Sequence, residues 1–323
     1  MIRKTILIAA CAICVHPGGI MAQSYPTKPV RWVVPYAAGG PTDTLARVIS
    51  QKVAEQWGGR IVVDQRPGAN SIIGTEIVAR AQSDGYTMLV ALPAFAINPS
   101  VYPKLPYDTL REIAPVTLFG TAGYVVVVNA SLPAKSVSDL VALAKASPGQ
   151  LSYGSGGTAS PAHLAIELLQ QLAGVRMVHV PYKGGGPALV DLAGGRIQAM
   201  ANPISSSMPF IKAGKIRAIA VTSSKRARTL PDLPTVSEAG LGSYDVSTWY
   251  GLFAPAKTPA AVMQFVSKSV SKALQDPELA KRLAGYDVEP AGNSPKEFSR
   301  FVRDEIKRWG QVVRRASIKI ESQ

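Results

Sequence analysis

Two glycine-rich stretches are the parts of this sequence best suited to chemistry. Residues 35–44 (PYAAGGPTDT) and 153–165 (YGSGGTASPAHLA) each place glycines between a predicted strand end and a predicted helix start. A helix start leaves backbone N–H groups unpaired and carries a partial positive charge of roughly half a unit. Glycine permits a sharp turn and lets a ligand approach the backbone. Both stretches therefore predict anion binding by main-chain N–H groups, although tight turns without a ligand share this composition.

Polar residues in both stretches are suited to starting a helix. Ser160 is a predicted N-cap and Pro161 fits the first helical position, while Thr42 or Asp43 can cap the helix after the first stretch. A carboxylate is unfavourable at an anion site. We therefore expect Asp43 to turn toward its own helix start and to pair with Arg47 one turn later.

Catalytic alternatives have weaker support. Ser155 lies among glycines with His163 nearby, so a secreted hydrolase is an alternative, but the G-x-S-x-G pattern is absent. The phosphate-binding glycine motifs of nucleotide sites are absent too. Beyond residue 22 the chain has two histidines, His163 and His179, and no cysteine, so we expect no zinc site and no cofactor. The sequence favours a binding protein over an enzyme.

Three further segments are weaker candidates for a site. Lys183 precedes a third run of glycines and could supply charge to a bound acid, or it could be an ordinary surface lysine. Residues 91–100 and 201–207 each follow a predicted strand and could line a binding cleft. Trp249 and Tyr250 could contribute to a site, but as core aromatics they need no ligand.

The elements that must position these residues alternate between strand and helix, which predicts an α/β fold of mainly parallel sheets flanked by helices. The predicted strands lie at 30–34, 61–64, 87–91, 124–129, 152–154, 177–180, 198–202, 217–222 and 248–254. The predicted helices lie at 42–57, 72–81, 161–173, 187–193, 206–213, 259–275, 277–283 and 295–316, with another beginning at Ser136.

After residue 222 the sequence has the composition of a loop. The helices predicted at the end of the chain are too few to form a second domain by themselves. We therefore expect two lobes: residues 23–123 with 248–323 form lobe 1, and residues 124–247 form lobe 2. Two strands connecting two lobes imply a cleft and a hinge.

Residues 1–22 have the layout of a secretory signal peptide, with a basic head, an apolar run and a small residue at Ala22. A buried N-terminal helix and lipidation at Cys11 are the alternatives.

Hydrophobic content of 47% and charged content of 17% suit a soluble globular protein. The net charge of +14 comes from scattered residues, so we expect no nucleic-acid partner.

Several segments together resemble the Bug-type periplasmic solute-binding receptors of tripartite tricarboxylate transporters. They include YPTKPVRWVVPYAAGGPTDTLAR, YGSGGTASPAHLAIELL, VPYKGGGPALVDLAGGRIQAM and WYGLFAPAKTPAAVM, and the resemblance covers essentially the whole chain after residue 22. It implies a two-lobed periplasmic binding protein of the type II, or Venus-flytrap, class. It also implies a small carboxylated ligand, delivery to membrane permease subunits, a periplasmic location and a monomer.

The resemblance also implies roles for particular residues. One ligand carboxylate would be held by the two glycine turns, at Tyr36, Ala38, Gly39, Asp43, Ser155, Gly156, Thr158 and Ser160. The far end of the ligand would be read by Pro93, Ala94, Phe95, Asn202, Ser205 and Tyr250. Many relatives have small polar residues where this chain has Ala-Leu-Pro-Ala-Phe at 91–95. A less polar distal pocket is therefore expected, suited to an aromatic acid or an amide. A periplasmic sensor that feeds a signalling receptor is the alternative to transport.

Overall fold

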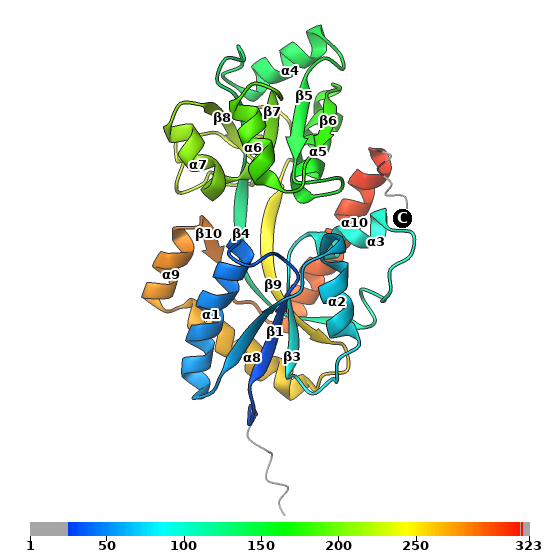
Figure 1. The fold of residues 1–323 in the computed structure, drawn as a ribbon, viewed down its shortest axis with the longest axis vertical. Coiled ribbons are helices and arrows are strands. Elements are labelled where there is room, and N and C mark those ends of the chain that lie inside the picture. The colour runs from blue at the N-terminus through cyan, green and yellow to red at the C-terminus, as the bar shows by residue number, and fades with distance from the viewer. Residues whose placement is uncertain (1–24, 317, 319–323) are drawn as a thin grey trace, which may run out of the picture.

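The computed structural model describes residues 25–316 and residue 318, which form two lobes connected by two long strands (Figure 1). The proposed signal peptide lies outside the described residues. The predicted two-lobed α/β fold is confirmed, with helices on the faces of each sheet. The expectation of mainly parallel sheets is wrong, because the strands that connect the lobes pair antiparallel with their neighbours and make both sheets mixed. Within the described part of the chain, no helix is long and apolar enough to cross a membrane.

Lobe 1 contains a six-stranded sheet in the order β2-β1-β3-β9-β4-β10. Its strands are β1 (Val30–Val34), β2 (Ile61–Gln65), β3 (Thr87–Ala91), β9 (Ser247–Pro255), the first part of β4 (Ile113–Asn129) and β10 (Val288–Pro290). Its helices are α1 (Pro41–Trp57), η1 (Ala69–Ser71), α2 (Ile72–Ala79), α3 (Ala94–Val101), α8 (Ala260–Leu274), α9 (Pro277–Ala284) and α10 (Pro295–Arg315). Strands β1, β2 and β3 are parallel, and β9 runs antiparallel to β3.

Lobe 2 is built on the second part of β4, in the order β8-β4-β7-β5-β6. Its other strands are β5 (Ser152–Ser155), β6 (Val178–Pro181), β7 (Ala199–Pro203) and β8 (Ile216–Val221). Its helices are α4 (Val137–Ala146), α5 (Pro161–Ala173), α6 (Gly185–Ala193) and α7 (Ile204–Lys212). Strands β5, β6 and β7 are parallel to one another, and β7 is antiparallel to β4.

The β4 strand belongs to both sheets. Gly123 pairs with Ser247 at the end of one sheet, and the next residue, Tyr124, pairs with Pro203 at the beginning of the other. The register also fixes which sheet edges face each other. Ala91, at the carboxyl end of β3, pairs with Gly251, and Pro203 is the carboxyl end of β7. The carboxyl ends of the parallel strands in each lobe therefore lie at the edge nearest the other lobe (Figure 1).

The core of lobe 1 lies on both faces of its sheet. Trp32 stacks on Phe119 on one face, at 5.4 Å between ring centroids, and Phe253 contacts Phe298 of α10 on the other at 5.0 Å. The α10 helix continues to lobe 2, where the Val312 carbonyl accepts a hydrogen bond from Gln171 of α5. This contact gives the lobes a connection in addition to the two strands.

Two of the three helix N-caps predicted from the sequence occur in the structure. Ser136 and Ser160 cap their helices by accepting from the N–H groups of Asp139 and His163, which confirms both predictions. The prediction that Thr42 or Asp43 caps α1 is wrong: Gly40 is the N-cap, and it makes no side-chain bond. The carboxylate of Asp43 instead accepts from Gly39, one residue before the helix cap.

Candidate ligand-binding site

The first glycine turn connects β1 to α1 at the edge of lobe 1 that faces lobe 2. Asp43 is only 4% exposed, and its carboxylate accepts from the Gly39 N–H at 2.9 Å and the Arg47 Nε at 3.0 Å. Burial raises the pKa of this carboxyl, but bonds from Gly39, Gln65 and Arg47 outweigh it and leave the pKa below its usual value. The expected pairing of Asp43 with Arg47 is confirmed, and the backbone partner of its carboxylate is Gly39, which precedes the N-cap.

The Asp43 bonds leave other donors of this turn free. Among the described residues, the N–H groups of Ala38, Thr42 and Asp43 have no hydrogen-bond acceptor. Ala38 and Gly39 are exposed, and Gly39 has a left-handed φ of 76° with open space where a Cβ would lie. The turn therefore presents backbone donors at the start of a helix, which is an arrangement suited to an anion.

The second glycine turn connects β5 to α5 at the facing edge of lobe 2. Thr158 is exposed, Gly156 is partly exposed, and Ser160 caps the helix. The N–H groups of Gly156 and Thr158 donate to no acceptor in the part of the chain that the structure covers. This turn also presents backbone donors toward the other lobe.

The third run of glycines lies directly beside the second turn. The Gly184 N–H donates to the Gly156 carbonyl at 3.3 Å, and a Cβ on Gly185 would lie 2.5 Å from the Asn202 Oδ1. The starts of α5, α6 and α7 therefore lie side by side. Lys183 is exposed, and it has no carboxylate partner among the described residues. It adds a positive charge to an edge that already contains three helix starts.

Most of the residues expected to contact the far end of the ligand are buried. Tyr36 and Ser205 are partly exposed, whereas the others are buried: Pro93, Ala94, Phe95, Asn202 and Tyr250. Phe95 is 1% exposed and packs on Phe253, with ring centroids 4.5 Å apart, so it lies in the core beneath this edge. The Asn202 Nδ2 donates to the hydroxyls of Ser206 and Ser207, which directs this amide group into α7.

The hydroxyl of Tyr36 is a buried polar group at this edge. Its oxygen has no hydrogen-bond partner within residues 25–316, and burial raises the pKa of the phenol far above its usual value. A buried hydroxyl without a partner costs free energy unless a ligand or water satisfies it. The Tyr36 oxygen is buried close to Ser71 and to the backbone of Leu92, so it supports the first turn from within.

The structure pairs Ser155 with His179, not with the sequence neighbour His163. The Ser155 Oγ lies 2.7 Å from the His179 Nε2, and it also accepts from the Gly157 N–H at 3.1 Å. Ser155 is fully buried, so this serine holds the turn from beneath and is not exposed for attack on a substrate. Sequence reasoning missed the contact because parallel pairing of β5 with β6 is needed to bring His179 beside Tyr153.

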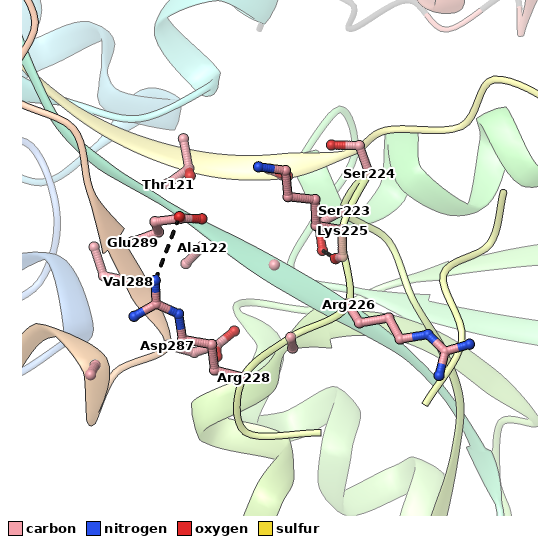
Figure 2. Close-up of a pocket in the computed structure, with 14 residues that line it drawn as sticks. Thr121, Ala122, Ser223, Ser224, Lys225, Arg226, Arg228, Asp287, Val288 and Glu289 are labelled. Carbon is pink, nitrogen blue, oxygen red and sulfur yellow. Dashed lines mark hydrogen bonds and ion pairs between the residues drawn. The ribbon is translucent and has the colours of Figure 1, made fainter. Parts of the chain in front are cut away.

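A separate cavity of about 480 Å³ lies at the hinge (Figure 2). It is lined by residues 121–123 of β4, by residues 223–228 after β8, and by residues 287–289 near β10. None of the expected ligand-binding residues lines it. Within the described residues, no group of three or more His, Cys, Asp or Glu side chains could hold a metal ion.

Comparison with known proteins agrees with this architecture. Residues 45–318 match the family model described as the tripartite tricarboxylate transporter family receptor. Protein BugT of Bordetella pertussis is 34% identical over 325 residues, which cover 99% of this chain and 100% of BugT.

Two solved relatives contain a bound ligand. Rpa4515 of R. palustris, solved with adipate, is 36% identical with a TM-score of 0.83, and the match covers 92% of this chain and 100% of Rpa4515. MatC (Rpa3494) of Rhodopseudomonas palustris, solved with malate, is 32% identical with a TM-score of 0.78, and the match covers 90% of this chain and 100% of MatC. The chain therefore belongs to the tripartite tricarboxylate transporter receptor family, as a Bug-type solute-binding protein.

Proposed function

We propose that this protein captures a small carboxylate between its two lobes and delivers it to the membrane permease subunits of a tripartite tricarboxylate-type transporter. One carboxylate group of the ligand binds the free N–H groups of both glycine turns, at residues 36–43 and 155–160. Ser155 contributes indirectly, by fixing the second turn. The rest of the ligand contacts the partly apolar edge formed by residues 93–95, 202–205 and Tyr250.

The observation that carries this proposal is the position of unused backbone donors on both facing edges. Ala38, Thr42 and Asp43 contribute N–H groups from lobe 1, and Gly156 and Thr158 contribute them from lobe 2. Hydrogen bonds to a carboxylate are charge-assisted and about twice as strong as neutral ones. A ligand that contacts both edges stabilises the closed arrangement by its differential affinity for that arrangement.

The two ligand-bound relatives support a dicarboxylate as the first class to test. Adipate and malate differ in length and polarity, and both contain two carboxylates. The common requirement is one carboxylate at the glycine turns. The buried Pro93 and Ala94 favour a less polar distal end, which points toward adipate more than malate.

We further propose that residues 23–123 and 248–323 move as one lobe and residues 124–247 as the other. The change of sheet between Gly123 and Tyr124 supports this division. The protein acts as a periplasmic monomer, exported by a signal peptide at residues 1–22.

Calorimetric titration of the purified protein with adipate and with malate tests the proposal. Dimethyl adipate is the matched control, because it retains the carbon chain and lacks the charges. We expect measurable binding of a free dicarboxylate and none of its diester, accompanied by a smaller radius of gyration in solution scattering. Equal binding of acid and ester, or no response to either dicarboxylate, would contradict the proposal.

A further inference from the structure

Two stacked imidazoles lie beneath the second glycine turn. His163 of α5 and His179 of β6 have ring centroids 3.7 Å apart and planes inclined by 11°. Tyr153 of β5 stacks with both rings, at 6.0 Å and 5.0 Å. His163 is only 4% exposed. Three elements therefore contribute aromatic rings to one buried stack directly behind a proposed ligand-binding turn.

Each imidazole is hydrogen-bonded to the turn. The His163 Nδ1 accepts from the Ala159 N–H at 3.0 Å. The His179 Nε2 bonds to the Ser155 Oγ, which accepts from the Gly157 N–H and donates to the Gly157 carbonyl at 2.9 Å. The two bonds hold the turn at both of its ends. The N–H groups that lie between them, on Gly156 and Thr158, remain free for a ligand.

The turn requires such support because its backbone is strained. Ala159 has a left-handed φ of 60°, which costs about 1 kcal/mol for a residue with a Cβ. Gly157 has a φ of 132°, a region open mainly to glycine. Strained backbone persists where surrounding contacts fix it. The bond from Ala159 to His163 is such a contact.

The hydrogen bond from Ala159 also determines where His163 can hold a proton. The His163 Nδ1 can accept only when it has no proton, so the proton of a neutral ring is on Nε2, which lies 3.7 Å from the Glu167 Oε1. The titratable groups that face the stack are Tyr153, Glu167 and the two histidines themselves. The Tyr153 hydroxyl donates to Glu167. Burial lowers the pKa of His163 to about 3 and that of His179 to about 4.

We propose that His163 and His179 are positioning residues for ligand capture: as a stacked pair bonded to residues 155–159, they orient the free N–H groups of the second turn toward lobe 1. This inference rests on the proposed function, because it assigns a role at the same site. Neither histidine contacts the ligand. Both act through the backbone of residues 155–159.

Matched substitutions separate hydrogen bonding from packing. His163→Phe and His179→Phe retain an aromatic ring but remove the nitrogen that bonds to the turn. His163→Asn can return an acceptor near the Nδ1 position. His179→Gln can return an amide group near the Nε2 position, able to bond the Ser155 hydroxyl. We expect each Phe variant to bind adipate about tenfold more weakly, as for the loss of one buried hydrogen bond, and the Asn and Gln variants to recover most of this affinity.

A second measurement does not depend on the ligand. Amide hydrogen exchange at Ala159 and Gly157 should be slow in the unmodified protein and at least tenfold faster in the corresponding Phe variant, whereas α4, far from the turn, should be unchanged. In protein labelled with ¹⁵N-histidine, the His163 signal should report the Nε2–H tautomer down to pH 5.

The outcomes distinguish the two proposals. In one outcome, amide exchange is slow in the unmodified protein and fast in the Phe variants, but no dicarboxylate binds. That result would support the role of the hydrogen bonds in holding the turn and would overturn the proposed function. Tight binding by both Phe variants, with unchanged exchange, would overturn the positioning role and leave the proposed function standing. Weak binding in both Phe variants without rescue by Asn or Gln would also overturn the positioning role, because packing alone would then explain the loss.

Discussion

Two properties of Gly39 determine the backbone conformation of the first turn. It has a left-handed φ of 76°, and its N–H group donates to Asp43. A Cβ there would meet no atom within 4 Å, so a substitution acts through backbone strain and not through a clash. We expect Gly39→Val to weaken carboxylate binding at least tenfold while lowering the free energy of unfolding by only about 1–2 kcal/mol.

Gly58 supplies a matched control at the other end of the same helix. It has a φ of 59° and equally open surroundings. Gly58→Val should therefore cost a similar free energy of unfolding and leave affinity for adipate unchanged. Titration calorimetry and urea unfolding of both variants measure the comparison. Equal affinity in the two variants would remove the first turn from the binding site.

The two buried histidines predict how stability depends on pH. Their folded pKa values, about 3 and about 4, lie below the ordinary 6.5 of imidazole, so the unfolded chain takes up protons first. The free energy of unfolding should fall as the pH decreases below about 6.5, by up to about 1.4 kcal/mol per pH unit for each histidine. The pKa of Asp43 is lowered in the folded protein, so the contribution of this carboxylate is lost only at lower pH.

Urea unfolding between pH 7 and pH 5.5 measures this slope above the range in which Asp and Glu carboxyl groups take up protons. The double variant His163→Phe, His179→Phe should show a nearly flat profile over the same interval. A steep profile in that variant would show that other groups cause the loss of stability.

At the scale of elements, Glu305 of α10 holds β9, one of the two strands that connect the lobes, through a buried hydrogen bond. This carboxylate is only 6% exposed, and its Oε2 accepts from the indole N–H groups of Trp249 at 2.9 Å and Trp309 at 3.0 Å. Glu305→Leu leaves two buried donors unpaired and should lower the free energy of unfolding by about 2–4 kcal/mol. Glu305→Gln retains an acceptor for the indoles, loses the ion pair of Oε1 with Arg308, and should cost about 1 kcal/mol. Equal losses in the two variants, measured from urea midpoints, would contradict this role.

The strands and helices predicted from the sequence were those with strong local signals. Apolar periodicity placed strands such as 87–91, and serine or proline starts placed α5 and α10. The first part of β4 was missed because Pro115 and Gly120 interrupt its pattern, and the register shifts at both places. The α3 helix was missed because it contains Pro99.

Predictions about the site were limited by contacts between distant residues. The two glycine turns could be found from sequence, because strand end, glycine and helix start are neighbours along the chain. The bond of Ser155 to His179 spans 24 residues, and that of Trp249 to Glu305 spans 56. Such contacts depend on the strand register and helix packing of the folded chain, which local patterns do not specify.

At the scale of the whole molecule, the hinge cavity is crossed by contacts between the lobes. Arg228, which follows β8, lies 3.7 Å from Glu289 of β10, as Figure 2 shows. The adjacent Thr229 donates to the Asp287 carboxylate at 3.0 Å. In the lobe 1 sheet, β4 and β9 separate β10 from β3 and β1, so the cavity and the proposed ligand edge lie on opposite sides of the connecting strands.

These contacts should favour the open arrangement. A rotation that brings the ligand edges together on one side of the strands separates the groups on the other side. The exposed ion pair contributes at most about 1 kcal/mol, and the Thr229 hydrogen bond contributes about as much. We therefore expect the double variant Arg228→Ala, Thr229→Val to bind adipate about three- to tenfold more tightly, because less free energy opposes closure.

Arg226→Ala is the matched control for this prediction. Arg226 lies on the same segment but pairs with Glu238 inside lobe 2, at 2.9 Å. Its removal changes the charge of the cavity without breaking a contact between lobes, so affinity should not change. Calorimetry gives the affinities, and solution scattering of the unliganded variants gives the population of the closed arrangement. Weaker binding in the double variant would instead place these contacts in the closed arrangement and reverse the assigned direction of hinge motion.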